Sequence, residues 1–372
     1  MMEQIRVAII DPVGNKAGMD QYDMFLAKGL QHSGVSATIF TNCKELNGFS
    51  SNKLLFKNDY KNRFIQVLYT LLGYLRSWQW CKKGNYKVTL FHVYHFSLVD
   101  FLVTWWFSST GFQVALIVHD VESLRYKTSS FFRRKIVNDF ATYRFVHSVL
   151  AEMELKKVAN DKSVTLIPHG HFIDPDRPQI DKKEARKLLG IPEEKFCPLF
   201  FGMIKSGKGL DVLIDAFSVL DDRFLLLIAG RFRGTENNYK YRIDELVKQS
   251  RCMAALHYIP TEDMELWMAA SDLIVLPYRH VYQSGVILQA MSRKIPVVIS
   301  DLPAFSTFKQ NGIALTFEVN NSHQLADILK NAPQDYSQYV DRADKAFEYI
   351  RKAHDWNVVG KKMAEQFSSR CA

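Results

Sequence analysis

Two lysines and several glycines follow a predicted strand in the C-terminal half of the chain. The strand runs into Gly202, and the loop after it carries Lys205 and Lys208 before a helix is expected to begin at Leu210. Glycine lets a backbone approach a phosphate closely, the lysines supply positive charge, and the helix N-terminus adds its dipole. The pattern indicates an anion site, and its spacing differs from that of the P-loop. The alternative interpretation is a flexible basic turn.

A second polar loop follows the strand expected at Leu273–Leu276, and it opens a helix at Ser284 and Gly285. The first amides of a helix have no partner inside it, so the backbone N–H groups around Val286 can hold phosphate oxygens. Gln289 lies five residues after Ser284, and we expect it on the same side of the helix. The alternative is that Gln289 faces solvent.

Two further signals stand near other predicted strand ends. Arg231 follows a strand that ends at Gly230, and an arginine there suits a phosphate or a carboxylate. Ile259 lies in the sequence His257–Pro260. We expect a short strand to meet a loop in this sequence, so that backbone groups can read the edge of a nucleotide base.

In the N-terminal half, His119 and Asp120 come directly after the apolar run Val114–Val118. Side chains that act on a ligand emerge at the carboxyl ends of the strands in an α/β sheet. Histidine exchanges a proton near neutral pH. The spacing alone leaves open whether this pair is catalytic or structural.

Alternating strands and helices are expected to position these residues. The apolar run Ile5–Ile10, a helical pattern over Asp20–Ser33 and a strand at Val35–Phe40 form a βαβ unit. Such a unit implies a parallel sheet with a right-handed crossover. The further strands expected in this half are Val88–His92, Val114–Val118, Val146–Ala151 and Val164–Ile167.

The segment Pro168–Pro178 is rich in Pro, Asp and His, which suits a linker between domains. The alternation then restarts, with strands expected at Phe196–Phe201, Phe224–Ala229, Leu273–Leu276 and Val297–Ile299, and helices at Leu210–Leu220, Tyr239–Ser250 and Ser284–Met291. We therefore expect an α/β protein of two doubly wound Rossmann-like domains facing a cleft, with ligands beyond the carboxyl ends of the strands.

The composition indicates the compartment. A length of 372 residues with 47% hydrophobic residues fits two domains with ordinary cores. The five cysteines are scattered without metal-ligand or redox spacing, which is typical of reduced thiols in a cytoplasmic protein. The N-terminus lacks the features of a signal peptide, and no apolar run reaches the ~18 residues that a membrane span needs. We expect a soluble or peripheral cytoplasmic protein.

The charge indicates an anionic partner. The net charge is +9, and the excess of Lys and Arg is concentrated in residues 1–172. A basic half favours an anionic membrane surface, and ordinary solvated surface charge is the alternative. The segment Arg63–Lys83 is apolar and aromatic with basic ends, so it is either a helix packed on the sheet or an interfacial helix resting on a membrane. No known nucleic-acid-binding module is present, so no nucleic acid partner is expected.

The motifs together resemble the GT-B glycosyltransferases, most closely family 4. The resemblance rests on FGMIKSGKGLD, IAG, SDLIVLPYR, QSGVILQAM and PVVISDLP, with IPHGHF before them and HDWNVVGKKMAEQF near the end. It implies an acceptor-binding domain at residues 1–170 and a nucleotide-sugar-binding domain at residues 171–355. It also implies that a terminal helix at residues 356–372 packs back toward the N-terminal domain.

Position by position, the resemblance implies a diphosphate-binding loop at Gly202 and Lys208. The arginine of the family pattern is replaced by Met203, and we expect Lys205 to supply the missing cation. Both glutamates of the family's helix motif are also replaced, by Val281 and by Gln289. Gln289 would then contact the ribose hydroxyls less strongly than a carboxylate does.

The Gln-Ser-Gly-Val start of the helix resembles a variant in which the amides of Ser284 and Gly285 hold the distal phosphate. His119 corresponds to an N-domain histidine that lies near the donor sugar in the family. Gly14 and Gly18 match the flexible loop on the acceptor side.

The resemblance implies transfer of a sugar from a UDP- or GDP-sugar to a glycan or a lipid-linked acceptor in surface polysaccharide synthesis. It also implies anomeric retention. We expect no cofactor besides this co-substrate and no metal, because no Asp-x-Asp clamp follows a strand in the C-terminal half. The alternatives are a nucleotide-sugar epimerase of the same fold, which the missing glutamates disfavour, and a non-catalytic glycosyltransferase-like subunit.

Overall fold

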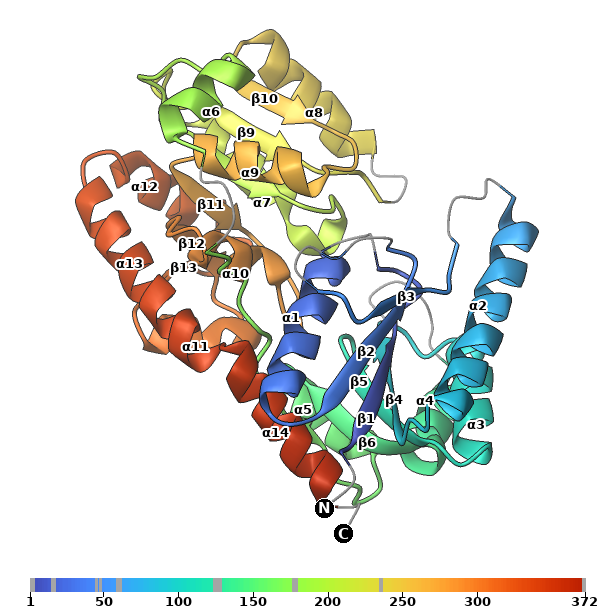
Figure 1. The fold of residues 1–372 in the computed structure, drawn as a ribbon. Coiled ribbons are helices and arrows are strands. Elements are labelled where there is room, and N and C mark those ends of the chain that lie inside the picture. Colours follow the sequence, from blue (N-terminus) through green and yellow to red (C-terminus); the bar gives the residue numbers. More distant parts are fainter. Residues whose placement is uncertain are drawn as a thin grey trace. The chain divides into compact units, whose positions relative to one another are not determined.

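The computed structural model describes residues 4–14, 18–43, 46, 49–57, 62–122, 129–175, 180–233 and 237–369. The chain forms two compact units (Figure 1). Unit 1 comprises Met1–Gly170 and Ala353–Ala372, and unit 2 comprises His171–Lys352. Residues 15–17 of the predicted acceptor-side loop and 176–178 of the predicted linker lie outside the described residues. Within the described part of the chain, every helix is too short or too polar to cross a bilayer.

The described residues of unit 1 form a seven-stranded sheet in the order β3-β2-β1-β4-β5-β6-β7. Every pair of neighbouring strands is parallel. The strands are β1 (Arg6–Ile10), β2 (Ser36–Thr41), β3 (Asn52–Leu54), β4 (Val88–Val93), β5 (Gln113–Val118), β6 (Ala141–Val146) and β7 (Thr165–Leu166). The strand order runs outward in both directions from β1 and β4, which is the doubly wound arrangement predicted from the sequence.

One predicted strand of unit 1, Val146–Ala151, was wrong. Strand β6 ends at Val146, and helix α5 (Val149–Val158) begins three residues later. The side chain of Ser148 caps this helix by accepting a hydrogen bond from the N–H of Ala151 at 3.2 Å. The apolar run continues from the strand across the cap into the helix, so apolar content alone does not mark the boundary.

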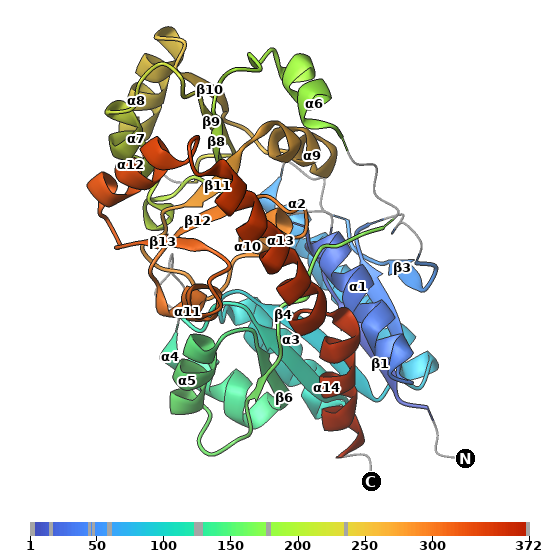
Figure 2. The ribbon, with the colours of Figure 1, turned by 90° about the vertical axis from the view of Figure 1, so that its left-hand side faces the viewer.

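Helices cover both faces of the sheet in unit 1. Helix α1 (Met19–His32) and helix α14 (Trp356–Ser368) lie side by side on one face (Figures 1 and 2). A Cβ atom at Gly360 would lie 2.1 Å from the carbonyl oxygen of Gly29, so only glycine allows this close approach. The C-terminal helix therefore belongs to the core of unit 1.

Helix α3 (Leu98–Ser109) covers the other face, where the rings of Phe107 and Phe91 meet at 5.3 Å. Helix α2 (Arg63–Lys83) packs beside α3 through the stacked rings of Trp78 and Trp106. The described part of unit 1 also contains α4 (Ser130–Lys135), a π-helical turn (Ile136–Phe140) and α5.

The described residues of unit 2 form a six-stranded parallel sheet in the order β10-β9-β8-β11-β12-β13. The strands are β8 (Pro198–Phe201), β9 (Leu226–Ala229), β10 (Cys252–Ala255), β11 (Leu273–Leu276), β12 (Val297–Ser300) and β13 (Leu315–Phe317). The short strand expected within His257–Pro260 was wrong, because β10 ends at Ala255 and those residues form a loop.

The helices of unit 2 fill two apolar cores, one on each face of its sheet. They are α6 (Lys182–Leu189), α7 (Leu210–Ser218), α8 (Asn237–Lys248), α9 (Thr261–Ala270), α10 (Gly285–Met291), α11 (Ser306–Gln310), α12 (Ser322–Asn331) and α13 (Tyr336–Ala353), with 3₁₀ turns at Ser206–Lys208 and Pro303–Phe305. Helices α7 and α10 begin after β8 and β11, so the two central strands deliver both predicted phosphate-binding loops.

Candidate functional site

The loop from Gly202 to Gly209 packs closely against the backbone that follows β9 and β11 in unit 2. Gly202 has a φ of 110° and Gly209 a φ of 63°, a region that favours glycine. A Cβ atom at Gly209 would lie 1.9 Å from the carbonyl oxygen of Pro277, and one at Gly230 would lie 1.7 Å from that of Gly202. The glycines therefore hold the lysine-bearing loop against the ends of β9 and β11.

Arg279, which follows the carboxyl end of β11, fixes the same loop. Its N–H donates to the carbonyl of Gly207 at 2.9 Å, and its Nη1 donates to the carbonyl of Ser206 at 2.7 Å. Its guanidinium also binds the carboxylate of Asp211. Partial burial acts to raise the pKa of Asp211, but the bonds and charge of Arg279 hold it below its usual range. Arg279 stands in the sequence motif SDLIVLPYR, but the motif alone does not indicate this role.

Lys208 and Ser284 are joined through one aromatic side chain. The Nζ of Lys208 lies 3.5 Å from the ring centroid of Tyr278, and the hydroxyl of Tyr278 lies 3.4 Å from the Oγ of Ser284. Burial raises the pKa of Tyr278 to about 12, and the charge of Lys205 acts in the opposite direction. The structure thus brings both predicted lysines and the start of α10 into one part of unit 2.

The start of α10 lies beside the lysine-bearing loop. Ser284 is the N-cap residue, and the structure shows no capping hydrogen bond from its side chain. A Cβ atom built on Gly202 would lie 3.6 Å from the Cγ2 of Val286, so the two loops meet at this helix start. The predicted lysines and the start of α10 are therefore neighbours, as the predicted phosphate site requires.

The three remaining predicted donor residues are placed differently from one another. Gln289 is only 6% exposed, which excludes the solvent-facing alternative. Its Oε1 accepts a hydrogen bond from Arg293 at 2.5 Å, and Arg293 also binds Glu265. Arg231 is exposed just after β9, while the side chain of Ile259 is buried in the core, so only its backbone can face a ligand.

In unit 1, buried or half-buried titratable side chains stand at the carboxyl edge of five neighbouring strands. From β1 to β7 in sheet order these side chains are Asp11, His92, His119, His147 and His169. Of these, only His119 was singled out from the sequence. Asp11, His92 and His169 lie within a few residues of a predicted strand end, which is a signal that the sequence contains. His147 falls inside the wrongly predicted strand Val146–Ala151, which hides its position at a strand end.

Tyr22 and Asp23 of α1 complete this row. The ring of Tyr22 makes edge contacts with all four of these histidines, and its hydroxyl lies 2.9 Å from the Nε2 of His147. The Oδ1 of Asp23 lies 2.8 Å from the Nε2 of His92. The Nδ1 of His92 lies 2.9 Å from the Nε2 of His119.

Burial dominates the protonation of this row. It lowers the pKa of His92 to about 4, and it lowers the pKa of His119 well below its usual value. It raises the pKa of Asp11 to about 7 and that of Asp23 to about 8, because a charged carboxylate is costly there too. Neutral forms are therefore favoured on both the histidines and the carboxyl groups.

The remaining predicted residues of unit 1 lie around this row. Asp120 is half-buried, and its charge adds to the effect of burial in raising the pKa of Tyr94. Gly14 has a φ of 31°, and its N–H donates to the carboxyl group of Asp11 at 2.9 Å. Gly18 has a φ of 75° and precedes the first residue of α1.

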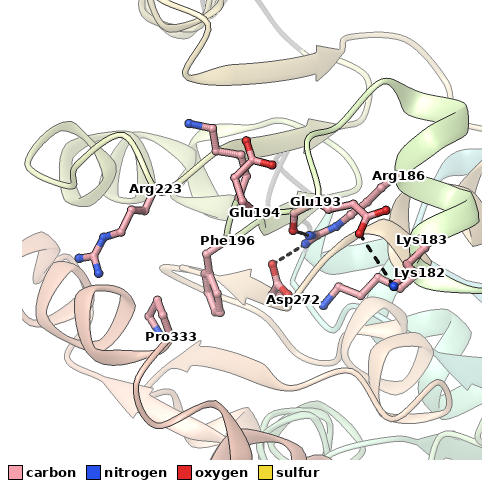
Figure 3. Close-up of a pocket in the computed structure, with 10 residues that line it drawn as sticks. Lys182, Lys183, Arg186, Glu193, Glu194, Phe196, Arg223, Asp272 and Pro333 are labelled. Atoms are coloured by element: carbon pink, nitrogen blue, oxygen red, sulfur yellow. Dashed lines mark hydrogen bonds and ion pairs between the residues drawn. The ribbon is translucent and has the colours of Figure 1, made fainter.

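A separate hollow in unit 2 is lined by Lys182, Arg186 and Asp272 (Figure 3). The buried carboxylate of Asp272 binds Arg186 at 2.7 Å and Lys182, and it accepts the N–H of Cys197. These bonds tie α6 to β8 and β11, so the group stabilises the sheet. None of the predicted site residues lines this hollow. Among the residues that the structure describes, no three His, Cys, Asp or Glu side chains are grouped to hold a metal ion.

Residues 196–335 match the family model described as glycosyl transferases group 1. A lipopolysaccharide core biosynthesis mannosyltransferase, LpsB, from Rhizobium meliloti (strain 1021) is 30% identical over 153 residues, which cover 40% of this chain and 43% of that protein. The matched region thus spans less than half the length of that relative.

Solved structures match over nearly the whole chain. A sucrose-phosphate synthase from Thermosynechococcus elongatus superposes with a TM-score of 0.75 at 17% identity and covers 99% of both chains. Anabaena HepE in complex with UDP-glucose superposes with a TM-score of 0.75 at 17% identity, over 98% of this chain and 100% of that one. At this level of identity the likeness establishes the fold, which is that of the GT-B glycosyltransferases.

Proposed function

We propose that this protein transfers a sugar from a nucleoside-diphosphate sugar to a glycan or a lipid-linked acceptor. The match of residues 196–335 to the glycosyl transferases group 1 model and the GT-B fold support this proposal. The UDP-glucose bound by the similar HepE structure supports a sugar-nucleotide donor. The similarity to a lipopolysaccharide core mannosyltransferase supports an acceptor from surface polysaccharide synthesis. The donors that we propose are UDP-sugars and GDP-sugars.

One observation carries this proposal, namely the link from Lys208 through Tyr278 to Ser284. In the proposed reaction an acceptor hydroxyl attacks the anomeric carbon, and the bond to the diphosphate breaks. Negative charge grows on the leaving diphosphate, where Lys205, Lys208 and the amides of Ser284 and Gly285 would stabilise it. Preorganised charges and dipoles of this kind are commonly the largest contribution to catalysis.

His119 is the residue that we propose for proton transfer, and Asp120 beside it is proposed to shape the same site. The resemblance to family 4 supports a metal-independent reaction that retains the anomeric configuration. Nuclear magnetic resonance of the product anomer tests retention. Transfer in the presence of excess chelator tests independence from metal ions.

A screen of UDP-, GDP- and ADP-sugars by thermal unfolding tests the donor class. A ligand that binds only the folded state at about 100 times its Kd stabilises that state by about 2.7 kcal/mol. We expect one nucleotide class to raise the midpoint of unfolding, and transfer assays with that donor follow. An unfolding midpoint that no tested sugar nucleotide raises would contradict the proposal.

A non-catalytic subunit of the same fold is the second candidate, because three positions depart from the family pattern. Met203 replaces an arginine, and Val281 and Gln289 replace two glutamates. The bond from Arg293 to Gln289 is a structural use of that side chain. Donor binding without transfer or hydrolysis, across all acceptors and donors tested, would favour this candidate.

We also propose that unit 1 docks on an anionic membrane surface through the α2–α3 apolar surface. This surface consists of Phe64, Ile65, Val67, Leu68, Leu71 and Leu75 on α2 and Leu98, Val99, Leu102 and Trp105 on α3. All of these side chains are exposed, and Phe64 is 87% exposed. The indole N–H of Trp78 donates to Thr110 at 3.0 Å, so α2 lies beside the end of α3 (Figure 1).

The charge at the end of α2 suits an anionic bilayer. Lys82 and Lys83 are exposed there, and Arg76 is exposed one and a half turns earlier. Each basic residue near such a surface contributes about 1 kcal/mol, and buried apolar side chains add to this. Both parts of an interfacial helix are therefore present in α2.

Flotation with vesicles tests this docking. We expect binding to phosphatidylglycerol vesicles, weaker binding to phosphatidylcholine vesicles, and loss of binding in Leu68→Glu. The matched control is Leu188→Glu, which places the same change at an exposed leucine of α6 in unit 2. Equal binding by both variants would overturn the proposal. A dimer in solution that Leu68→Glu dissociates would assign the surface to a second copy instead.

A further inference from the structure

The guanidinium of Arg279 joins three segments that meet at the carboxyl edge of the sheet in unit 2. Its Nη1 donates to the carbonyl of Ser206, in the lysine-bearing loop, at 2.7 Å. The same Nη1 donates to the carboxylate of Asp211, in the first turn of α7, at 2.9 Å, and Nη2 binds the other carboxylate oxygen. Its Nε donates to the Oδ1 of Asn320, between β13 and α12, at 2.6 Å. All three nitrogens of the guanidinium are therefore directed at oxygen atoms of this chain.

These bonds require an arginine and its carboxylate partner. The guanidinium is planar and presents five N–H donors in a rigid fork, whereas the ammonium of a lysine is a point charge with three rotatable donors. The side chains of Arg279 and Asp211 are 31% and 29% exposed, so the pair is partly shielded from water. Because Asp211 balances its charge and its donors point to the protein, Arg279 acts on the loop rather than on a ligand.

The carbonyl that Arg279 holds belongs to the turn that carries both lysines. Ser206 and Lys208 are the first and last residues of one 3₁₀ turn. The N–H of Lys208 donates to the carbonyl of Lys205 at 2.8 Å, so the two lysines are joined through the same turn. On its other side the turn rests on Tyr278, whose ring centroid lies 3.5 Å from the Nζ of Lys208. A movement of the Ser206 carbonyl therefore moves the lysines.

We propose that Arg279 is a positioning residue that orients Lys205 and Lys208 toward the diphosphate of the donor, with Asp211 holding its guanidinium in place. The inference rests on the proposed function. Bonds between an ammonium and a phosphate depend on distance and direction. Without Arg279 the turn is held less firmly, and the donor must order it on binding, which lowers affinity. The effect of Arg279 on binding thus passes through the lysines.

Calorimetry with UDP, GDP and ADP measures this effect, using the diphosphate that wild type binds most tightly. We expect Arg279→Ala to raise its Kd roughly 10-fold, which corresponds to about 1.4 kcal/mol. Arg279→Lys should restore little of the affinity, because an ammonium does not reproduce the fork. If lysine restored wild-type affinity, positive charge alone would explain the effect and positioning would be refuted.

A double-variant cycle tests whether the effect passes through the loop. Adding Arg279→Ala to Lys208→Ala should raise the Kd by a factor at least threefold smaller than adding it to wild type, because one of the two oriented lysines is already absent. Equal factors in both backgrounds would overturn the inference, since Arg279 would then act independently of Lys208.

Hydrogen–deuterium exchange of the chain without a nucleotide provides a readout that needs no donor. The amides of residues 203–209 should exchange faster in Arg279→Ala than in wild type. The matched control is Arg242→Ala, which breaks an arginine–carboxylate pair with Asp215, one turn further along α7. This control should keep the wild-type exchange and the wild-type Kd. Should Arg279→Ala fail to fold, Asp211→Asn replaces it, and we expect a rise of about threefold in Kd with faster exchange of the same loop.

The two readouts separate this inference from the proposed function. Unchanged loop exchange, or an unchanged Kd in a protein that binds a nucleoside diphosphate, would overturn the role of Arg279 while the donor site stands. A wild-type protein that binds none of the three nucleotides would refute the proposed function. Faster exchange in Arg279→Ala would then still show that this arginine orders the loop.

Discussion

Lys208→Ala tests the donor site most directly. The Nζ of Lys208 lies 3.5 Å from the ring centroid of Tyr278, whose hydroxyl contacts Ser284 at the start of α10. Removing this charge removes a charge-assisted bond to the proposed diphosphate. A hydrogen bond to a charged group contributes about 1.5–3 kcal/mol, so the donor Kd should rise roughly 10- to 150-fold.

The folded state should be affected much less than donor binding. The variant loses a cation–π contact, which contributes about 0.5–1 kcal/mol at an exposed site. Isothermal titration calorimetry with the donor found in the screen measures the affinity, and thermal unfolding measures the stability. The control is Lys240→Ala, which removes an exposed lysine of α8 that lies outside the proposed site. A donor Kd for Lys208→Ala within about threefold of wild type would refute the assignment of Lys208.

Three further predictions concern the glycine contacts and the buried carboxylate. Gly230→Ala should weaken donor binding and lower the unfolding midpoint, because the added Cβ would lie 1.7 Å from a backbone oxygen. Gly207→Ala is the control, since its Cβ would meet no atom within 4 Å, and it should leave donor binding and the midpoint unchanged. Gly360→Ala should destabilise unit 1 by about 1–3 kcal/mol through overpacking, as measured by urea unfolding; an unchanged midpoint would show that α14 shifts freely. Burial raises the pKa of Asp23 to about 8, so its contribution to stability is present at low pH and is lost as the pH rises toward that value. Between about pH 5 and 8, urea unfolding should therefore show a smaller loss of stability for Asp23→Asn than for wild type.

The fold and the lysine loop could be predicted because their signals are local. Strand β11 has the predicted bounds Leu273–Leu276, and the glycines at 202 and 209 mark the loop in the sequence itself. The wrongly predicted strand Val146–Ala151 shows that apolar content alone does not locate the end of a strand. Its residues continue an apolar run, and the capping Ser148 is the signal that separates strand from helix.

The buried row of unit 1 could be predicted only in part. His92 and His119 each stand at the end of a predicted strand, and the carboxyl-edge rule would have grouped them. His147 lay inside the wrongly predicted strand Val146–Ala151, so the same rule would have missed it. Asp23 lies on a helix, and its contact with His92 joins positions 69 residues apart. Such a contact depends on how α1 packs on the sheet, which a local pattern does not determine. Gln289 stands where the family pattern has a glutamate. Its structural role likewise depends on side chains from elsewhere, because Gln289 binds Arg293, which in turn binds Glu265.

Helix α14 of unit 1 is synthesised only after unit 2. Helix α14 packs on α1 through Gly360 and Gly29, yet all of unit 2 lies between them in the sequence. A ribosome must therefore complete His171–Lys352 before the face of α1 that α14 covers can be shielded. During that interval unit 1 exposes an apolar surface while unit 2 is free to fold first. Chaperone dependence and aggregation of nascent chains should therefore concentrate in unit 1.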